Sequence, residues 1–166
     1  MHKNSKAGFY LVRFKNCTRT NINMGSDLQV GDIMTKEVII IQYGKNMQDV
    51  AKLMKKHEIG SIIVVDDGKE KRARGIITER DIIHKVLMKG KDPYKVKVEE
   101  IMSKPLRVIK ADTSLEEAAG AMRDNHIKRL PVVGDNSELV GLISEGDIMK
   151  VFPLIVDLME EKAVMR

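Results

Sequence analysis

The spacing of apolar and polar residues changes several times along the chain, and the order of these changes predicts a βαββα arrangement. A run of β-branched residues at 38–41 predicts a strand. Two further apolar runs, 61–65 and 74–77, flank a polar stretch and predict a hairpin. Between the first strand and the hairpin, apolar residues recur at helical spacing: Met47, Val50, Ala51 and Met54. A closing helix is expected to begin at Asp81.

The same succession occurs twice. The segment VGDIMTKEVIIIQ from Val30 matches VEEIMSKPLRVIK from Val98 at an offset of 68, and this register continues through the helix into the hairpin. GIITERDI from Gly75 then matches GLISEGDI from Gly141 at an offset of 66, because the first copy has two extra residues in its polar stretch. An internal repeat of this kind indicates one structural unit present in two copies.

The second copy predicts the same elements. Its strands are expected over three apolar runs: 106–109, 130–133 and 139–143. Its helix is marked by four apolar residues: Leu115, Ala118, Ala119 and Met122. Thr113 or Ser114 is the expected N-cap of that helix, and a closing helix is expected to begin at Asp147.

These elements predict an α/β (α+β) fold. One copy of about sixty residues buries little apolar surface, so we expect the two βαββα repeats to pack sheet to sheet with pseudo-two-fold symmetry. Gly90 and Pro93 interrupt both periodicities and indicate a linker. The predicted division is a partly flexible N-terminal extension over 1–29, repeat 1 over 30–89, a linker over 90–97, repeat 2 over 98–157 and a C-terminal tail over 158–166.

The composition fits a globular protein with an aliphatic core. The chain has 166 residues, of which 43% are apolar and 4% aromatic, and it has eleven Met and no Trp. Cys17 is the only cysteine, which excludes an intramolecular disulfide and any site with several cysteines. No apolar run reaches the length of a membrane span or a secretory signal. We therefore expect a soluble, cytoplasmic protein that does not associate with membranes.

The basic charge is concentrated at one end. The net charge is +5, but residues 1–29 contain five basic residues against Asp27, and the remaining 137 residues carry 24 basic and 23 acidic groups. A nearly neutral body is a poor phosphate-backbone binder, whereas the basic tail could still contact nucleic acid.

Three features coincide in both copies: the leading IMT or IMS, the hairpin strands HEIGSIIVVDD and NHIKRLPVVGD, and the terminal GIITERD and GLISEGD. Together they resemble the tandem CBS-domain pair, or Bateman module, over about residues 30–152. The resemblance implies a regulatory, non-catalytic module. Its cleft between repeats would bind an adenosine-containing ligand: AMP, ADP, ATP or an S-adenosyl compound.

In the family, the motif Asp accepts hydrogen bonds from the ribose hydroxyls, and Asp81 and Asp147 hold that place here. An ionised carboxylate suits this role because charge-assisted hydrogen bonds are stronger than neutral ones. Thr78 and Ser144, at the strand-to-helix turns, are the expected second anchors. The alternative is that both Asp residues simply cap their helices, and the two roles are compatible.

The two clefts are expected to differ. Lys128 and Arg129 match the family position that faces a ligand phosphate, where copy one has Gly60 and Ser61, so we favour the Asp147 cleft. At the Asp147 cleft the resemblance implies further ligand contacts from Ile143, and from Val38 and Gly60 of the partner repeat. At the Asp81 cleft it implies ligand contacts from Leu106 and Arg80. Solvated surface charges remain the alternative for Lys128, Arg129 and Arg80.

The sequence lacks the motifs of an enzyme. His57-Glu58 begins a zinc-protease pattern, but that pattern requires His where Ser61 stands. Phosphate-binding glycine loops, dinucleotide-binding turns, CxxC pairs and nucleophile elbows are missing from the sequence. We expect no catalytic residue, no metal site and no catalytic cofactor.

The ends match neither repeat. AGFYLVRF is a possible strand. We expect much of the remaining N-terminal segment to be mobile. Alternatively, translation begins at Met24. Pro153 is expected to kink the C-terminal helix or start a new one. The resemblance implies a homodimer, and the downstream protein partner is unknown. Besides the adenosine sensor, two hypotheses stay open: a ligand-independent dimerisation scaffold, and a nucleic-acid-binding protein that uses its basic tail.

Overall fold

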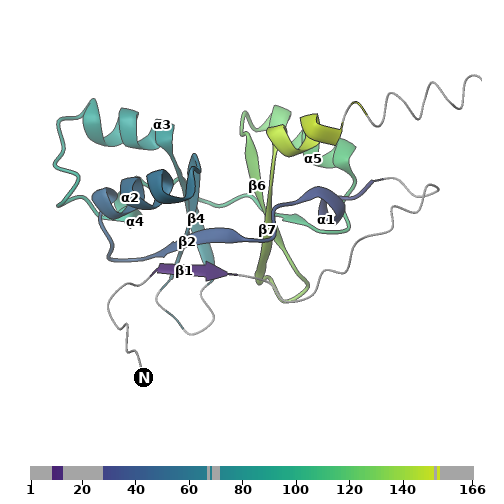
Figure 1. Ribbon diagram of the computed structural model, residues 1–166, viewed down its shortest axis with the longest axis horizontal. Helices are drawn as coiled ribbons and strands as arrows, with labels where there is room; N and C mark the ends of the chain where they lie inside the picture. Colours follow the sequence, from purple (N-terminus) through teal and green to yellow (C-terminus); the bar gives the residue numbers. More distant parts are fainter. Residues whose placement is uncertain (1–8, 13–27, 67, 69–71, 152, 154–166) are drawn as a thin grey trace, which may run out of the picture. The chain divides into compact units, whose positions relative to one another are not determined.

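The computed structural model describes residues 9–12, 28–66, 68, 72–151 and 153 (Figure 1). The expected mobility of the N-terminal segment, the alternative start at Met24 and the tail at 158–166 lie outside these residues, as does the course of the chain after Pro153. Within the described part, no helix is both long and apolar enough to cross a membrane.

The described residues fall into two compact units, each built from several stretches of chain. Of the described residues, unit 1 contains 9–12, those within 37–107, and 137–139. Unit 2 contains 28–36, 108–136 and those from 140 onward. Each unit contains the strands and helices of one predicted repeat, which confirms the α/β class and the two βαββα copies.

Unit 1 is built on a four-stranded sheet with the order β1-β2-β3-β4. Strand β2 (Val38–Gln42) pairs in parallel with β3 (Ser61–Val65), and β3 pairs antiparallel with β4 (Ala73–Thr78) as the predicted hairpin. Strand β1 (Phe9–Val12) runs antiparallel beside β2 (Figure 1), so the predicted strand in AGFYLVRF is confirmed over these four residues.

The helices of unit 1 follow from their capping residues. Helix α2 (Met47–His57) begins after Asn46, whose side chain accepts a hydrogen bond of 2.9 Å from the backbone of Asp49. Helix α3 (Glu79–Asp81) continues into the π-helix η1 (Ile82–Leu87). The closing helix therefore begins two residues before Asp81, and the prediction of its start was wrong because a different residue caps it.

The core of unit 1 uses alternate residues of the sheet. Five strand residues pack with the helices: Ile39, Ile41, Ile62, Val64 and Ile77. Helix α2 contributes the apolar stripe predicted from its spacing, with Leu53 in place of Ala51: Met47, Val50, Leu53 and Met54. Val86 from η1 closes the same core. Burial of this aliphatic surface is the main stabilising contribution within the unit.

Unit 2 repeats the plan with a three-stranded sheet, β5-β6-β7. Strands β6 (Arg129–Val133) and β7 (Leu139–Ser144) form the predicted hairpin. Helix α5 (Leu115–Asp124) begins after Ser114, whose hydroxyl accepts a hydrogen bond of 3.2 Å from the backbone of Glu117, which settles the N-cap. A closing helix spans 145–151, so its predicted start at Asp147 was wrong by two residues.

The first strand of copy two is shorter than expected. Strand β5 contains only Ile109–Lys110, which pair with Val132 and Val133 of β6, whereas the prediction covered 106–109. Leu106 to Val108 make no ladder pair, although the register of Ile109 and Lys110 would place them beside Arg129 to Pro131 of β6. The apolar residues at 106–108 therefore gave a false strand signal.

The segment that leads into each repeat packs in the other unit. Helix α1 (Val30–Ile33) precedes β2 in sequence, yet its first backbone amides donate to Thr113 (2.9 Å) and Ala111 (2.7 Å) of unit 2. Helix α4 (Val98–Ile101) precedes β5, yet its first amide donates to Lys45 of unit 1 over 3.0 Å. The two leading segments are thus exchanged between the units.

Both exchanged segments reach the cores. Val30 and Val98 are completely buried, Val30 in the core of unit 2 and Val98 in that of unit 1. After each helix the segment pairs with the last hairpin strand: Thr35 exchanges two hydrogen bonds of 2.9 Å with Leu142, and Ser103 pairs in the same way with Ile76. The two pairs occupy equivalent positions in the repeats.

This pairing explains the first glycine of the repeated GIIT and GLIS motifs. A Cβ on Gly75 would lie 2.6 Å from the Sδ and 3.0 Å from the Cβ of Met102, and Met34 crowds Gly141 in the same way. These methionines are the Met of the leading IMT and IMS. The two sequence signatures are therefore the two sides of one contact.

Gly75→Ala is expected to lower the free energy of unfolding by about 1–3 kcal/mol, the usual cost of forcing an extra methyl group into a packed core. Gly120→Ala is the matched control, because its Cβ would have only the Arg123 guanidinium nearby, at 3.8 Å, and alanine favours helix α5 by up to about 1 kcal/mol. Urea unfolding of both variants measures the difference. Equal stabilities for Gly75→Ala and the wild type would refute the contact.

Candidate functional site

A closed hydrogen-bonded box joins the end of the hairpin to the closing helix in unit 1. Oδ2 of Asp81 accepts hydrogen bonds from the backbone nitrogen (2.8 Å) and the hydroxyl (2.7 Å) of Thr78. The Thr78 oxygen in turn accepts from the backbone nitrogen of Asp81 over 3.2 Å. Thr78 is the N-cap of α3, and Asp81 is its third helical residue.

The same box forms in unit 2. Oδ2 of Asp147 accepts from the backbone nitrogen (3.0 Å) and the hydroxyl (2.6 Å) of Ser144, and the Ser144 oxygen accepts from the backbone nitrogen of Asp147 over 3.3 Å. The Thr/Ser-x-x-Asp spacing of the sequence is therefore a capping box in both copies. The expected capping role exists, but the hydroxyl residue is the N-cap and Asp completes the box.

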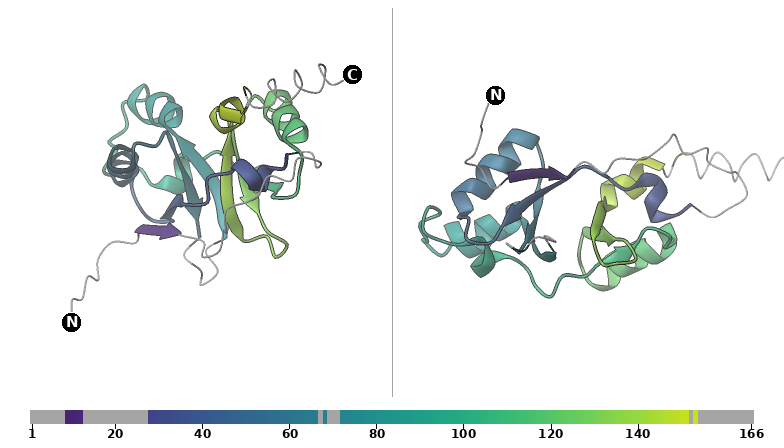
Figure 2. Two further views of the ribbon diagram at one scale, coloured as in Figure 1. Left: turned by 45° about the vertical axis from the view of Figure 1, so that its right-hand side comes forward. Right: turned by 90° about the horizontal axis from the view of Figure 1, so that it is seen from below.

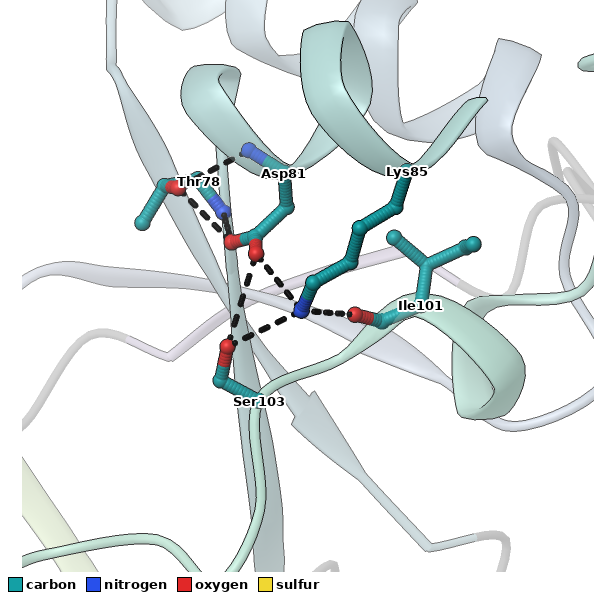
Figure 3. Close-up of polar contacts among 5 residues, drawn as sticks. All are labelled: Thr78, Asp81, Lys85, Ile101 and Ser103. Atoms are coloured by element: carbon teal, nitrogen blue, oxygen red, sulfur yellow. Dashed lines mark hydrogen bonds and ion pairs between the residues drawn. The ribbon is translucent and has the colours of Figure 1, made fainter. Parts of the chain in front are cut away.

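Each box fixes one carboxylate oxygen and leaves the other, Oδ1, to face different neighbours. In unit 1, Oδ1 of Asp81 lies 2.7 Å from the Nζ of Lys85 and 3.4 Å from the hydroxyl of Ser103 (Figure 3). In unit 2, Oδ1 of Asp147 lies 3.3 Å from the Nζ of Lys150. The side chains of Asp81 and Asp147 are similarly sheltered, with 12% and 14% exposed.

The surroundings of Asp81 favour its ionised form. Burial raises the pKa of this carboxyl, but the hydrogen bonds from Lys85 and Thr78, together with the charge of Lys85, outweigh burial, so the pKa lies below its ordinary value. The carboxylate is therefore negatively charged at neutral pH and acts as a hydrogen-bond acceptor.

The predicted basic residues lie beside the box in unit 2. The carbonyl of Lys128 accepts a hydrogen bond of 3.0 Å from Glu145, the first residue of the closing helix, and its Nζ lies 3.7 Å from the Glu145 carboxylate. Arg129 begins β6 and is half-buried. Its counterpart in copy one, Ser61, pairs with Thr78 across the hairpin. Lys128, Arg129, Ser144 and Asp147 therefore gather where the hairpin meets the closing helix.

The remaining predicted contacts are distributed over both units. Ile143 is completely buried in the core of unit 2. The other predicted residues belong to unit 1: Val38, Gly60, Thr78, Arg80, Asp81 and Leu106. Val38 is buried in β2, Leu106 is half-buried, and Arg80 is exposed on α3. The carbonyl of Gly60 accepts from the amide of Glu79, as that of Lys128 does in unit 2. The adenine and phosphate contacts assigned to these residues stay predictions.

A family model described as the CBS domain matches two segments of the chain, residues 30–88 and 98–154. The chain belongs to the CBS-domain family. The resemblance drawn from the repeated motifs is thereby confirmed, and the exchanged helices α1 and α4 are the first elements of the two matched segments.

Several CBS-domain proteins are similar over most of their length. A protein of Methanopyrus kandleri, MK0525, which is described as uncharacterized, is 37% identical over 81% of this chain and 68% of its own. The hexameric CBS-CP12 protein of bloom-forming cyanobacteria is 34% identical over 79% of this chain and 75% of its own, with a TM-score of 0.71. The CBS-domain pair of protein MJ0100, solved with 5′-methylthioadenosine and S-adenosyl-L-methionine, is 29% identical over 77% and 98%, with a TM-score of 0.68. None of the three is named as an enzyme.

A shallow hollow also lies in unit 2, where the closing helix (yellow) lies near α5 (green) in Figure 2. Its volume is about 590 Å³. Its lining combines apolar and charged residues: Ala119, Met122, Arg123, His126, Lys128, Glu145, Ile148 and Met149. Ser144 and Asp147 are not among the lining residues, whereas Lys128, which lies beside the carboxylate box, is one of them.

The sequence interpretation missed two residues at the Asp81 box, Lys85 and Ser103. The Asp81–Lys85 spacing of four residues is a signal for a helical ion pair. Ser103 gave no comparable signal, because the exchange of α4 into unit 1 brings it to Asp81 from 22 residues away.

Asp81→Asn is expected to lower the free energy of unfolding at pH 7 by about 1–2 kcal/mol, the value of a hydrogen bond to a charged group reduced by partial exposure of Lys85. Because the folded pKa is depressed below the ordinary 3.8, the stabilisation is complete above that value and is lost as the pH falls through it toward the folded pKa. Urea unfolding at pH 7 and pH 3 should therefore show a larger difference from wild type at pH 7 than at pH 3. Asp135→Asn, with a side chain 96% exposed, serves as the control. A difference that is equal at the two pH values contradicts the assignment.

Proposed function

We propose that this chain is a regulatory, non-catalytic module that binds an adenosine-containing compound through Asp147. The observation that carries the proposal is the orientation of this carboxylate. The box with Ser144 fixes Oδ2, so Oδ1 is presented in a defined direction, and its neighbour Lys150 is an exposed side chain with 78% of its surface in solvent. An exposed ion pair of this kind is weak and easily displaced by a ligand.

The chemistry of a ribose suits this arrangement. Its two neighbouring hydroxyls are donors, and an ionised carboxylate oxygen can accept from both. Ser144 donates its own hydroxyl to Asp147, so in this proposal it orients the carboxylate. Arg129 and Lys128, at the end of the hairpin next to the closing helix, would meet the charged group attached to the ribose, whether a phosphate or the carboxylate of an S-adenosyl compound.

Family membership supports the ligand class. The CBS pair of MJ0100, similar over most of both chains, was solved with an S-adenosyl compound and methylthioadenosine. Ribose and adenine are shared by those compounds and by AMP, ADP and ATP, so the proposal is for the adenosine moiety. Val38 and Gly60 remain the predicted adenine contacts.

The proposed output is a change in shape or in affinity for a protein partner. A ligand can shift such an equilibrium only by its different affinity for the two states. The hexameric CBS-CP12 relative supports self-association as part of this output. We propose a homodimer for this chain, acting in the cytoplasm, and light scattering of the purified protein with and without ligand would give its mass.

Two rival functions make different predictions. A ligand-independent scaffold would associate equally with and without adenosine compounds. A nucleic-acid-binding protein would depend on the basic residues at 1–23, which lie outside the described structure. Neither rival requires an oriented Asp147 carboxylate, and for that reason the sensor is the function we favour.

Asp147→Ala is expected to weaken the binding of S-adenosylmethionine or AMP by at least about thirtyfold, because two hydrogen bonds to a charged acceptor are lost at roughly 1 kcal/mol or more each. Calorimetric titration with AMP, ADP, ATP, S-adenosylmethionine and methylthioadenosine measures the effect, with GMP as the control ligand.

Asp135→Ala is the matched control variant, since it removes an exposed carboxylate from the same unit. Wild-type affinity in this control and loss in Asp147→Ala support the sensor. The proposal fails if none of the adenosine compounds binds the wild type, or if Asp147→Ala binds them normally.

A further inference from the structure

The ammonium group of Lys85 has three hydrogen-bond acceptors around it, all of them in unit 1. Its Nζ lies 2.7 Å from Oδ1 of Asp81, 2.9 Å from the carbonyl of Ile101 and 3.2 Å from the hydroxyl of Ser103 (Figure 3). A lysine has three protons to donate, and here three acceptors from two separate segments surround them. This ammonium is anchored by more than a single surface ion pair.

The anchored lysine covers the same carboxylate oxygen that the equivalent box presents in unit 2. Lys85 has 43% of its side chain exposed, whereas Lys150 beside Asp147 has 78% and a longer contact of 3.3 Å. The Asp81–Lys85 ion pair, in which the ammonium has three acceptors, is harder to separate than the exposed Asp147–Lys150 pair. On separation both groups lose hydrogen bonds that solvent replaces only in part.

Among the described residues of unit 2, no equivalent network surrounds Asp147. The repeat alignment places Val151 at the position of Lys85 and Thr35 at that of Ser103. Val151 is half-buried against the apolar core of unit 2 and has no ammonium to donate. The network is therefore a feature of the first copy and not of the fold.

We propose that Lys85 is an internal latch that closes the Asp81 carboxylate to ligands and so makes the two CBS copies unequal in affinity. The inference rests on the proposed function of Asp147, because it assumes that the open box is the one that binds. A ribose hydroxyl can reach Oδ1 of Asp81 only after the ammonium of Lys85 moves away. The free energy needed to separate Lys85 from Asp81 therefore weakens ligand binding at the first copy.

Opening the latch would also act on the exchanged segment. The carbonyl of Ile101 ends α4, and Ser103 is the residue that pairs with Ile76 of β4. Displacing Lys85 removes one contact from each of them. A ligand at Asp81 would thereby loosen the attachment of the α4 segment to unit 1, whereas binding at Asp147 would leave that attachment intact.

The test is calorimetric titration of the full chain with AMP and with S-adenosylmethionine, comparing wild type, Lys85→Met and Lys85→Gln. Methionine keeps the apolar stem, and glutamine keeps a donor without the charge. We expect the wild type to bind one ligand per chain at Asp147. Either variant should gain a second binding event at least tenfold tighter than any binding to Asp81 in the wild type, and adding Asp81→Ala should remove it.

Lys95→Met is the matched control, because Lys95 is an exposed lysine of the same unit in an ion pair of 3.9 Å with Asp92. It should titrate like the wild type. Val151→Lys supplies the converse test, since a lysine placed beside the second box should weaken binding at Asp147 about tenfold. Thermal unfolding confirms that each variant is folded before it is titrated.

The outcomes separate the two proposals. A wild type that binds at both carboxylates with equal affinity, or a Lys85→Met variant whose Asp81 affinity is unchanged or lower, overturns the latch and leaves the sensor standing. A lower affinity would mean that Lys85 is a ligand contact. Absence of binding in both the wild type and Lys85→Met overturns the sensor and the latch together.

Discussion

Each CBS repeat of this chain depends on the other for a complete core, because the segment that leads into each repeat packs in the opposite unit. Val30 and Val98 are completely buried in cores built otherwise from the other copy, and the backbone of each segment pairs with the last hairpin strand there. A single repeat would leave that strand edge and that core open. Removing either leading segment is therefore expected to destabilise the unit that it enters.

This exchange also determines what the two candidate sites can do. The exchanged segment pairs with each hairpin strand two residues before the hydroxyl residue of the capping box, so segment and box share one end of the strand. In unit 1 the segment additionally reaches the carboxylate of Asp81 through Ser103 and Lys85. In unit 2 the carboxylate of Asp147 instead faces an exposed lysine. One fold therefore presents the same box in two electrostatic settings.

Much of this could be predicted from the sequence, because the information is local or repeated. The hairpins and the helices α2 and α5 follow from periodicity, and the Thr/Ser-x-x-Asp spacing gave the residues of both boxes. What failed depends on partners distant in sequence. The exchange of α1 and α4 leaves no periodic signal, and the apolar run at 106–109 did not reveal that only Ile109 and Lys110 pair with β6. Lys85 gains its significance from Ile101 and Ser103, which only the exchange brings to it.

The central claim is that Asp147 holds an adenosine ligand while Lys85 keeps Asp81 closed. The most direct test is a crystal structure of the full chain grown with S-adenosylmethionine, and a second grown with AMP. The account predicts ribose hydroxyls within hydrogen-bond distance of Oδ1 of Asp147, with the Nζ of Lys85 still on Oδ1 of Asp81. A ribose bound to Asp81 in place of Lys85 while Asp147 stays empty, or a ligand that contacts neither carboxylate, would contradict it.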